Sequence, residues 1–138
     1  MCLFKAIKAR RFEWSDITLF KFRYSTGNMM YADVQYKLSS EDGEYKAYRK
    51  QNLVPDDKAD IFTVDSAFVL KLTELLKRCS LEKWDGFNKS DKRVLDGYSF
   101  GIYIRNAKGQ RIRASGYMKW PKNYKEVKQA LTELFDSL

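Results

Sequence analysis

Residues 98–117, YSFGIYIRNAKGQRIRASGY, carry the best-defined structural pattern of the sequence. Apolar side chains alternate with polar ones on both of its arms, as in β-strands that have one face against a core. Between the arms, residues 106–109 (NAKG) are typical of a three-residue hairpin loop, with Gly109 in the left-handed conformation. This stretch therefore predicts an antiparallel hairpin.

The register of this hairpin follows from the need to place its apolar side chains on one face. We expect Ile104 to pair with Ile112, and Ile102 with Ala114, toward the core. The opposite face then carries a group of basic and aromatic side chains, which are the candidate binding residues: Tyr103, Arg105, Arg111, Arg113 and Tyr117.

Two arginines face each other in this register, Arg105 and Arg111, while Tyr103 faces Arg113. Like charges directly across a strand pair are destabilising unless something compensates for them. A phosphate backbone would supply negative charge, and the tyrosines could stack on bases. The alternative is a solvated face on which water screens the repulsion.

The N-terminal half predicts a second hairpin. Residues 17–24 and 29–38 alternate apolar and polar side chains, and their apolar sets must share a face. Pairing Tyr24 with Met30 satisfies this condition and leaves residues 26–28 as a three-residue loop.

Two amphipathic helices are predicted from apolar side chains at helical spacing. The first covers residues 66–79, with Asp65 as its N-cap. The second begins near Asn123, with Glu126 placed for a capping box. Both helices have one apolar side, so we expect both to pack on the same sheet.

The class predicted from these elements is α+β. Residues 44–50 and 3–9 add strands to the two hairpins, and residues 80–97 are expected to form a loop. Short turns between strands favour an antiparallel sheet of about five to six strands, covered on one face by the two helices. We expect residues 1–138 to form a single domain.

The composition limits the classes of function. The chain has 138 residues, 44% of them hydrophobic, and a net charge of +8. Histidine is absent, which excludes a Ser-His-Asp triad, a Cys-His pair and His-ligated zinc. Residues 1–69 hold 11 basic and 10 acidic side chains, whereas residues 70–138 hold 15 and 8. The basic excess lies in the half that contains the 98–117 hairpin, which favours an anionic partner.

Acidic residues provide no convincing metal site. Glu44 lies in an acidic-x-Lys element, which resembles part of the metal site of restriction-type nucleases, and Asp33 lies on the neighbouring strand. In a hairpin of these two strands Asp33 and Glu44 would lie roughly 17 Å apart, too far to share a metal ion. The aspartates within residues 80–97 lack the alternating oxygens and closing Glu of a calcium loop, and their Asp-Gly pairs are typical of turns. We therefore predict no catalytic residue, no metal site and no cofactor.

The compartment is predicted from the N-terminus and the cysteines. Charges interrupt residues 1–11, unlike the apolar stretch of a signal peptide, and no apolar run approaches the roughly 20 residues of a membrane span. Cys2 and Cys79 are far apart and lack metal-ligand spacing. We expect a cytoplasmic protein with reduced thiols and no membrane association.

Residues 84–124 contain four short motifs in a fixed order: WDGF (84–87), VLDG (94–97), Ala114-x-Gly116 and Pro121-x-Asn123-Tyr124. This order resembles a pattern of small uncharacterised bacterial domains. The glycines and aromatics of the motifs are structural in type. The resemblance implies a hairpin followed by a helix, and it implies no catalytic residue.

Two functional hypotheses follow. The first is a small, non-enzymatic, basic binding module whose 98–117 hairpin face engages nucleic acid or another polyanion, weakly and in a salt-dependent way. The alternative is a protein-interaction or inhibitor module that binds an acidic protein through a sheet edge or an aromatic patch at Trp84 and Trp120. The charge distribution favours the first, and no oligomeric state is predicted.

Overall fold

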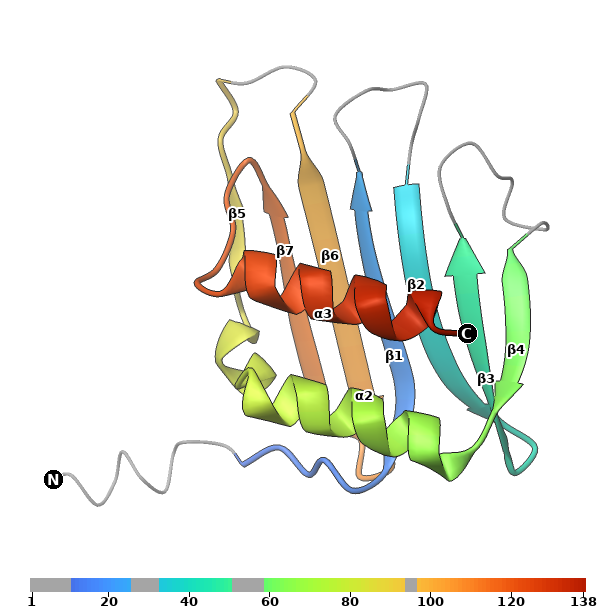
Figure 1. Ribbon diagram of the computed structural model, residues 1–138. Coiled ribbons are helices and arrows are strands. Elements are labelled where there is room, and N and C mark those ends of the chain that lie inside the picture. Colours follow the sequence, from blue (N-terminus) through green and yellow to red (C-terminus); the bar gives the residue numbers. More distant parts are fainter. Residues whose placement is uncertain (1–10, 26–32, 51–58, 94–96) are drawn as a thin grey trace, which may run out of the picture.

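A computed structural model describes residues 11–25, 33–50, 59–93 and 97–138 as two layers, a seven-stranded sheet and two α-helices (Figure 1). The strands are β1 (Ile17–Ser25), β2 (Asp33–Glu41), β3 (Glu44–Lys50), β4 (Asp60–Val64), β5 (Asn88–Ser90), β6 (Ser99–Asn106) and β7 (Arg111–Tyr117). The helices are α2 (Ser66–Arg78), the short 3-10 helix η3 (Leu81–Trp84) and α3 (Tyr124–Asp136). The spatial order of the strands is β4-β3-β2-β1-β6-β7-β5.

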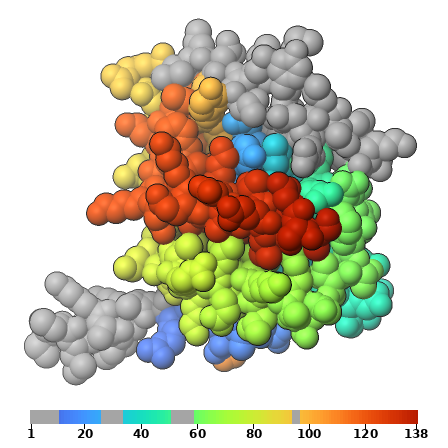
Figure 2. Space-filling model, in the orientation of Figure 1, coloured from blue at the N-terminus to red at the C-terminus, as the bar shows by residue number. Residues whose placement is uncertain are grey.

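Both α-helices lie on the same face of the sheet, which confirms the predicted α+β class and its two covering helices. Figure 2 shows α2 and α3 side by side over this covered face. Alternate side chains of the strands enter the core below them, among them Phe20, Phe22 and Ile104, each with no more than 1% of its surface exposed. From the helices, Leu76 and Phe135 complete the same core.

The hairpin of β6 and β7 has the predicted register. Gly109 has a φ of 81° and donates its N–H to the Asn106 carbonyl at 3.1 Å, so the turn is the one that the sequence predicts. Tyr98 belongs to the alternating apolar set of the first arm, but it precedes β6 and is 54% exposed, unlike the buried members of that set. The confirmed pairs are Ile102↔Ala114, Tyr103↔Arg113, Ile104↔Ile112 and Arg105↔Arg111.

The predicted register of the N-terminal hairpin is wrong. Tyr24 pairs with Val34 rather than Met30, a shift of four residues along β2. An even shift leaves every side chain on the same face, so the alternation that fixes the face cannot fix the register. The expected loop at residues 26–28 and the expected strand at residues 3–9 lie outside the described residues.

The sheet has more strands than the five to six expected, and it is mixed rather than wholly antiparallel. β4 was not among the expected strands, and its five residues pair with β3 and form one edge of the sheet. β5 was expected to be loop, and it runs parallel to β7 at the other edge. All three β5 side chains are exposed, so backbone pairing holds this strand and no apolar pattern marks it.

The start of α3 differs from the predicted capping box. Asn123 has a φ of 56° and makes no side-chain bond to the first turn of the helix. Its Oδ1 accepts a hydrogen bond from Trp84 Nε1 at 3.1 Å, and its Nδ2 donates to the Cys79 carbonyl at 2.9 Å. Asn123 thus ties α3 to the end of α2 and to η3. The predicted N-cap of α2 is confirmed, because Asp65 Oδ1 accepts from the Phe68 N–H at 3.1 Å.

The hairpin's two faces should respond differently to truncation. Ile104 is fully buried, so Ile104→Ala should lower the free energy of unfolding by about 2–5 kcal/mol. Arg111 is exposed, so Arg111→Ala should change it by less than about 0.5 kcal/mol. Urea unfolding of both variants measures this difference, and equal destabilisation would contradict the assignment of the faces.

Candidate functional site

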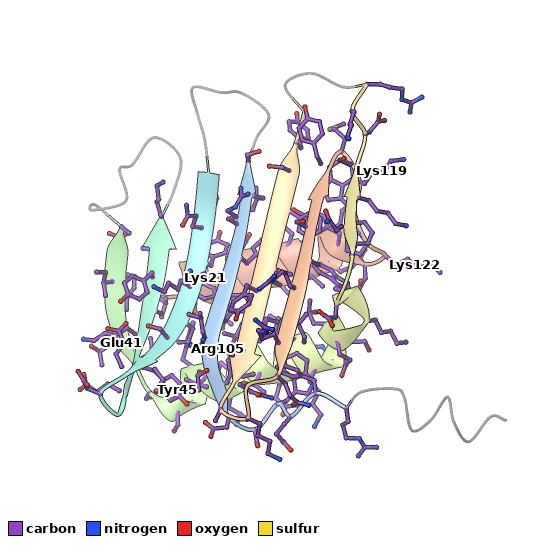
Figure 3. All side chains as sticks on the ribbon, turned by 180° about the vertical axis from the view of Figure 1, so that it is seen from behind. Lys21, Glu41, Tyr45, Arg105, Lys119 and Lys122 are labelled. Atoms are coloured by element: carbon purple, nitrogen blue, oxygen red, sulfur yellow. The ribbon has the colours of Figure 1, made fainter. Side chains whose placement is uncertain are left out.

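The face of the sheet away from α2 and α3, here called the open face, is strongly basic. Figure 3 views the molecule from this side, with Lys21 on β1 and Arg105 on β6 labelled. The strands β3, β2, β1, β6 and β7, neighbours in that order, all contribute cations to it. By strand alternation, these cations are Lys21, Arg23, Lys37, Lys46, Lys50, Arg105, Arg111 and Arg113.

The strand registers align open-face side chains in rows across the sheet. Tyr48 pairs with Lys37, Lys37 with Lys21, Lys21 with Tyr103, and Tyr103 with Arg113. Neighbouring strands are about 4.8 Å apart, so this row from β3 to β7 is about 19 Å long. The next rows lie about 7 Å away along the strands. The open face therefore presents a two-dimensional grid of cations.

The two tyrosines of this row are in contact with cations. Lys37 Nζ lies 4.7 Å from the centroid of the Tyr48 ring, and Arg113 Cζ lies 5.5 Å from the centroid of the Tyr103 ring. Each contact contributes about 0.5–1 kcal/mol at an exposed site and restricts the orientation of both side chains. Aromatic and positively charged groups are thus held together at both ends of the row.

A hollow of about 580 Å³ occupies the middle of the open face, between Tyr48 and Tyr103. Gly101 lies in its lining, next to Arg23 in the β1–β6 register. A Cβ placed at Gly101 would lie 3.7 Å from Arg23 Nε, so the missing side chain leaves space that this guanidinium partly covers. The hollow is consequently lined by cations from β1, β2, β3 and β7.

Acidic groups lie at the margins of this surface. Among the open-face strand side chains that the structure describes, the acids are Glu41 and Glu44, which pair at the β2–β3 turn. Glu41 accepts hydrogen bonds from the hydroxyls of Ser39 and, at 2.7 Å, Tyr48. These bonds hold the pKa of Glu41 below its usual value, and the bond to Glu41 raises the pKa of Tyr48. At the β7 edge, Asp85 Oδ1 accepts the backbone N–H of Arg113 at 2.9 Å.

Most of the residues predicted for the site lie together on the open face. Arg105, Arg111 and Arg113 are exposed, and Tyr103 is half-buried beside Arg113. Tyr117 has a different role, because its hydroxyl accepts the Gly97 N–H at 2.7 Å. A Cβ at Gly97 would lie only 3.0 Å from Tyr117 Cζ, so the ring packs closely on Gly97, two residues before β6 begins.

Several open-face residues were absent from the sequence-based site. Lys21, Arg23 and Lys37 lie on the polar side of β1 and β2, and the alternation in the sequence marks that polar side. What the sequence does not reveal is that β1 is the direct neighbour of β6. This long-range pairing joins their charges to those of the 98–117 hairpin.

Comparison of the chain with models of protein families and with curated proteins found no match. Within the described ranges, no group of three or more His, Cys, Asp or Glu side chains could hold a metal ion. No helix in the described part of the chain is long and apolar enough to cross a membrane.

The Glu41 contacts predict a pH-dependent contribution to stability. Because the folded state lowers the pKa of this carboxylate, its contribution is complete above the ordinary value of 4.5 and is lost as the pH falls through the lowered value. Thermal unfolding of wild type and Glu41→Gln measures this effect. The wild-type midpoint should exceed that of the variant at neutral pH, and the gap should shrink in acid. A gap that is equal at both pH values would contradict the assigned contacts.

Proposed function

We propose that this protein is a non-enzymatic binding module that engages nucleic acid, preferentially single-stranded, on its open face. The observation that supports this most is the row of Tyr48, Lys37, Lys21, Tyr103 and Arg113 across neighbouring strands. Proteins that bind single strands without sequence preference combine a positively charged surface with aromatic rings on which bases stack. This row has both components, flanked by further arginines and lysines.

The mechanism of binding would be mainly electrostatic. Lysine and arginine side chains neutralise phosphates and release condensed counterions, so affinity falls as salt rises. Arg105, Arg111 and Arg113 at one side of the hollow, with Lys21 and the other open-face cations, would contact the backbone. Tyr103 would stack on a base, as every base has a π-face. Little sequence preference is expected, because phosphate contacts carry no sequence information.

The alternative, an acidic protein partner, would use the same charges without needing the interleaved tyrosines. The aromatic patch expected for such a partner does not form as predicted, because Trp84 is only 3% exposed while Trp120 is 38% exposed. Recovery of a stoichiometric acidic protein with the native chain would favour this alternative.

We also propose a cytoplasmic location, where a free thiol such as that of Cys79 stays reduced.

The test is the salt dependence of binding to a short single-stranded oligonucleotide, measured by fluorescence anisotropy. The variant Arg105→Gln/Arg111→Gln/Arg113→Gln should bind more weakly at low salt. Each lost phosphate contact lowers the slope of log affinity against log salt by about 0.7, so the slope should fall by about 2.

The matched control removes equal charge from the covered side. Lys71, Lys77 and Arg78 are exposed on α2, so Lys71→Gln/Lys77→Gln/Arg78→Gln has the same net charge as the open-face variant. This control should keep the wild-type slope. Equal weakening of both variants, or no wild-type affinity at low salt, would overturn the proposal.

A further inference from the structure

A second hollow, of about 710 Å³, lies on the covered side of the sheet, between the start of α3 and the ends of β1 and β6. In Figure 1 these two strands extend beyond α3, and the hollow lies where they do so. Four aromatic side chains line it: Tyr24, Tyr98, Trp120 and Tyr124. We call it the aromatic hollow, and it is separate from the open face.

Two rings of the aromatic hollow, Tyr124 and Trp120, are positioned by contacts with other aromatic side chains. Tyr124 packs on Phe100 with 4.8 Å between ring centroids and on Trp84 at 6.0 Å, so this partly buried ring rests against the core. Trp120 lies 6.1 Å from Tyr124 at an interplanar angle of 35°. Trp120 and Tyr98 are two of the large apolar side chains that the described residues leave exposed, at 38% and 54%. A ring of Trp120 held against a fixed partner and open to solvent is a surface for stacking a planar group.

The charges around these rings favour an anion. Lys125 and Lys128 both line the hollow, against one acid, Glu126. Lys128 Nζ lies 4.2 Å from the centroid of the Tyr24 ring. One of the four rings of the hollow therefore already carries a cation of the protein. Burial raises the pKa values of Tyr24 and Tyr124, so both phenols stay uncharged at neutral pH and add no repulsion of an anion.

We propose that the aromatic hollow binds a planar aromatic anion of the size of a nucleoside monophosphate. The base stacks on Trp120, and the phosphate pairs with Lys125 and Lys128. The volume lies within the roughly 300–1,000 Å³ of pockets for small ligands. This inference does not depend on the proposed function of the open face, because the two surfaces lie on opposite sides of the sheet.

Tryptophan fluorescence provides the test. Trp14 and Trp84 are 7% and 3% exposed, so Trp120 is the indole of the described chain that a ligand in the hollow can reach. Adenosine 5′-monophosphate should quench the emission saturably. Adenosine, which lacks the phosphate, should bind about tenfold more weakly, since a hydrogen bond to a charged group contributes about that factor. Ribose 5-phosphate, which has no base, should not quench.

Two variants separate a built site from general charge. Lys125→Gln/Lys128→Gln should weaken binding of adenosine 5′-monophosphate about tenfold and leave adenosine binding unchanged. The control Lys71→Gln/Lys77→Gln loses the same charge from α2 and should bind as wild type does. Calorimetry on Trp120→Ala, an exposed position, should detect no binding of the nucleotide.

Three results would overturn the inference: no quenching by millimolar nucleotide, equal weakening by the control variant, or quenching by an oligonucleotide but not by the mononucleotide. The last result would assign the hollow to the end of a nucleic-acid strand instead. The proposed function of the open face has a separate readout. It would stand if Lys125→Gln/Lys128→Gln still bound the oligonucleotide, even if the wild type bound no mononucleotide.

Discussion

Aromatic side chains of α3 press against the sheet at both ends of the helix: Tyr124 lies 4.8 Å from Phe100 and Phe135 lies 4.8 Å from Tyr36, between ring centroids. Phe135 also meets Phe68 of α2 edge-on at 5.4 Å, so the two helices and the sheet share one aromatic contact region. Because both helices cover one face, the side chains of β2, β1, β6 and β7 that point toward them are mostly apolar and buried, and the intervening ones project from the other face. This packing leaves the other face of the sheet uncovered, and the lysines and arginines at the intervening positions make that open face basic.

The sequence predicted local structure well where two independent constraints agreed. In the 98–117 hairpin, the alternation fixed the face and Gly109 fixed the turn, so together they determined the register. Between β1 and β2 only the alternation was available, and a shift of four residues satisfies it equally well. β5 was not predicted, because its three residues are polar and exposed and show no alternation of apolar side chains. Backbone pairing with β7 holds this strand in the sheet.

The sequence predicted the part of the candidate site that lies in one local hairpin, and it missed the part that depends on the order of distant strands. Arg105, Arg111 and Arg113 belong to one local hairpin, whose geometry follows from neighbouring residues. Lys21 and Lys37 join them through the β2-β1-β6 order, which connects residues far apart in the chain. That order is set by which strands bury the most apolar surface together, a property of the whole core rather than of any short segment. The aromatic hollow also depends on such distant contacts.

The most direct test of the open face as a binding surface is an NMR titration with a short single-stranded oligonucleotide, following arginine Nε–Hε and tyrosine ring resonances. If the open face binds the strand, the signals of Tyr103, Arg105 and Arg113 shift progressively as strand is added, and Arg78, which is exposed on α2, does not respond. Shifts of equal size for Arg78, or shifts confined to residues of the covered side, would contradict it.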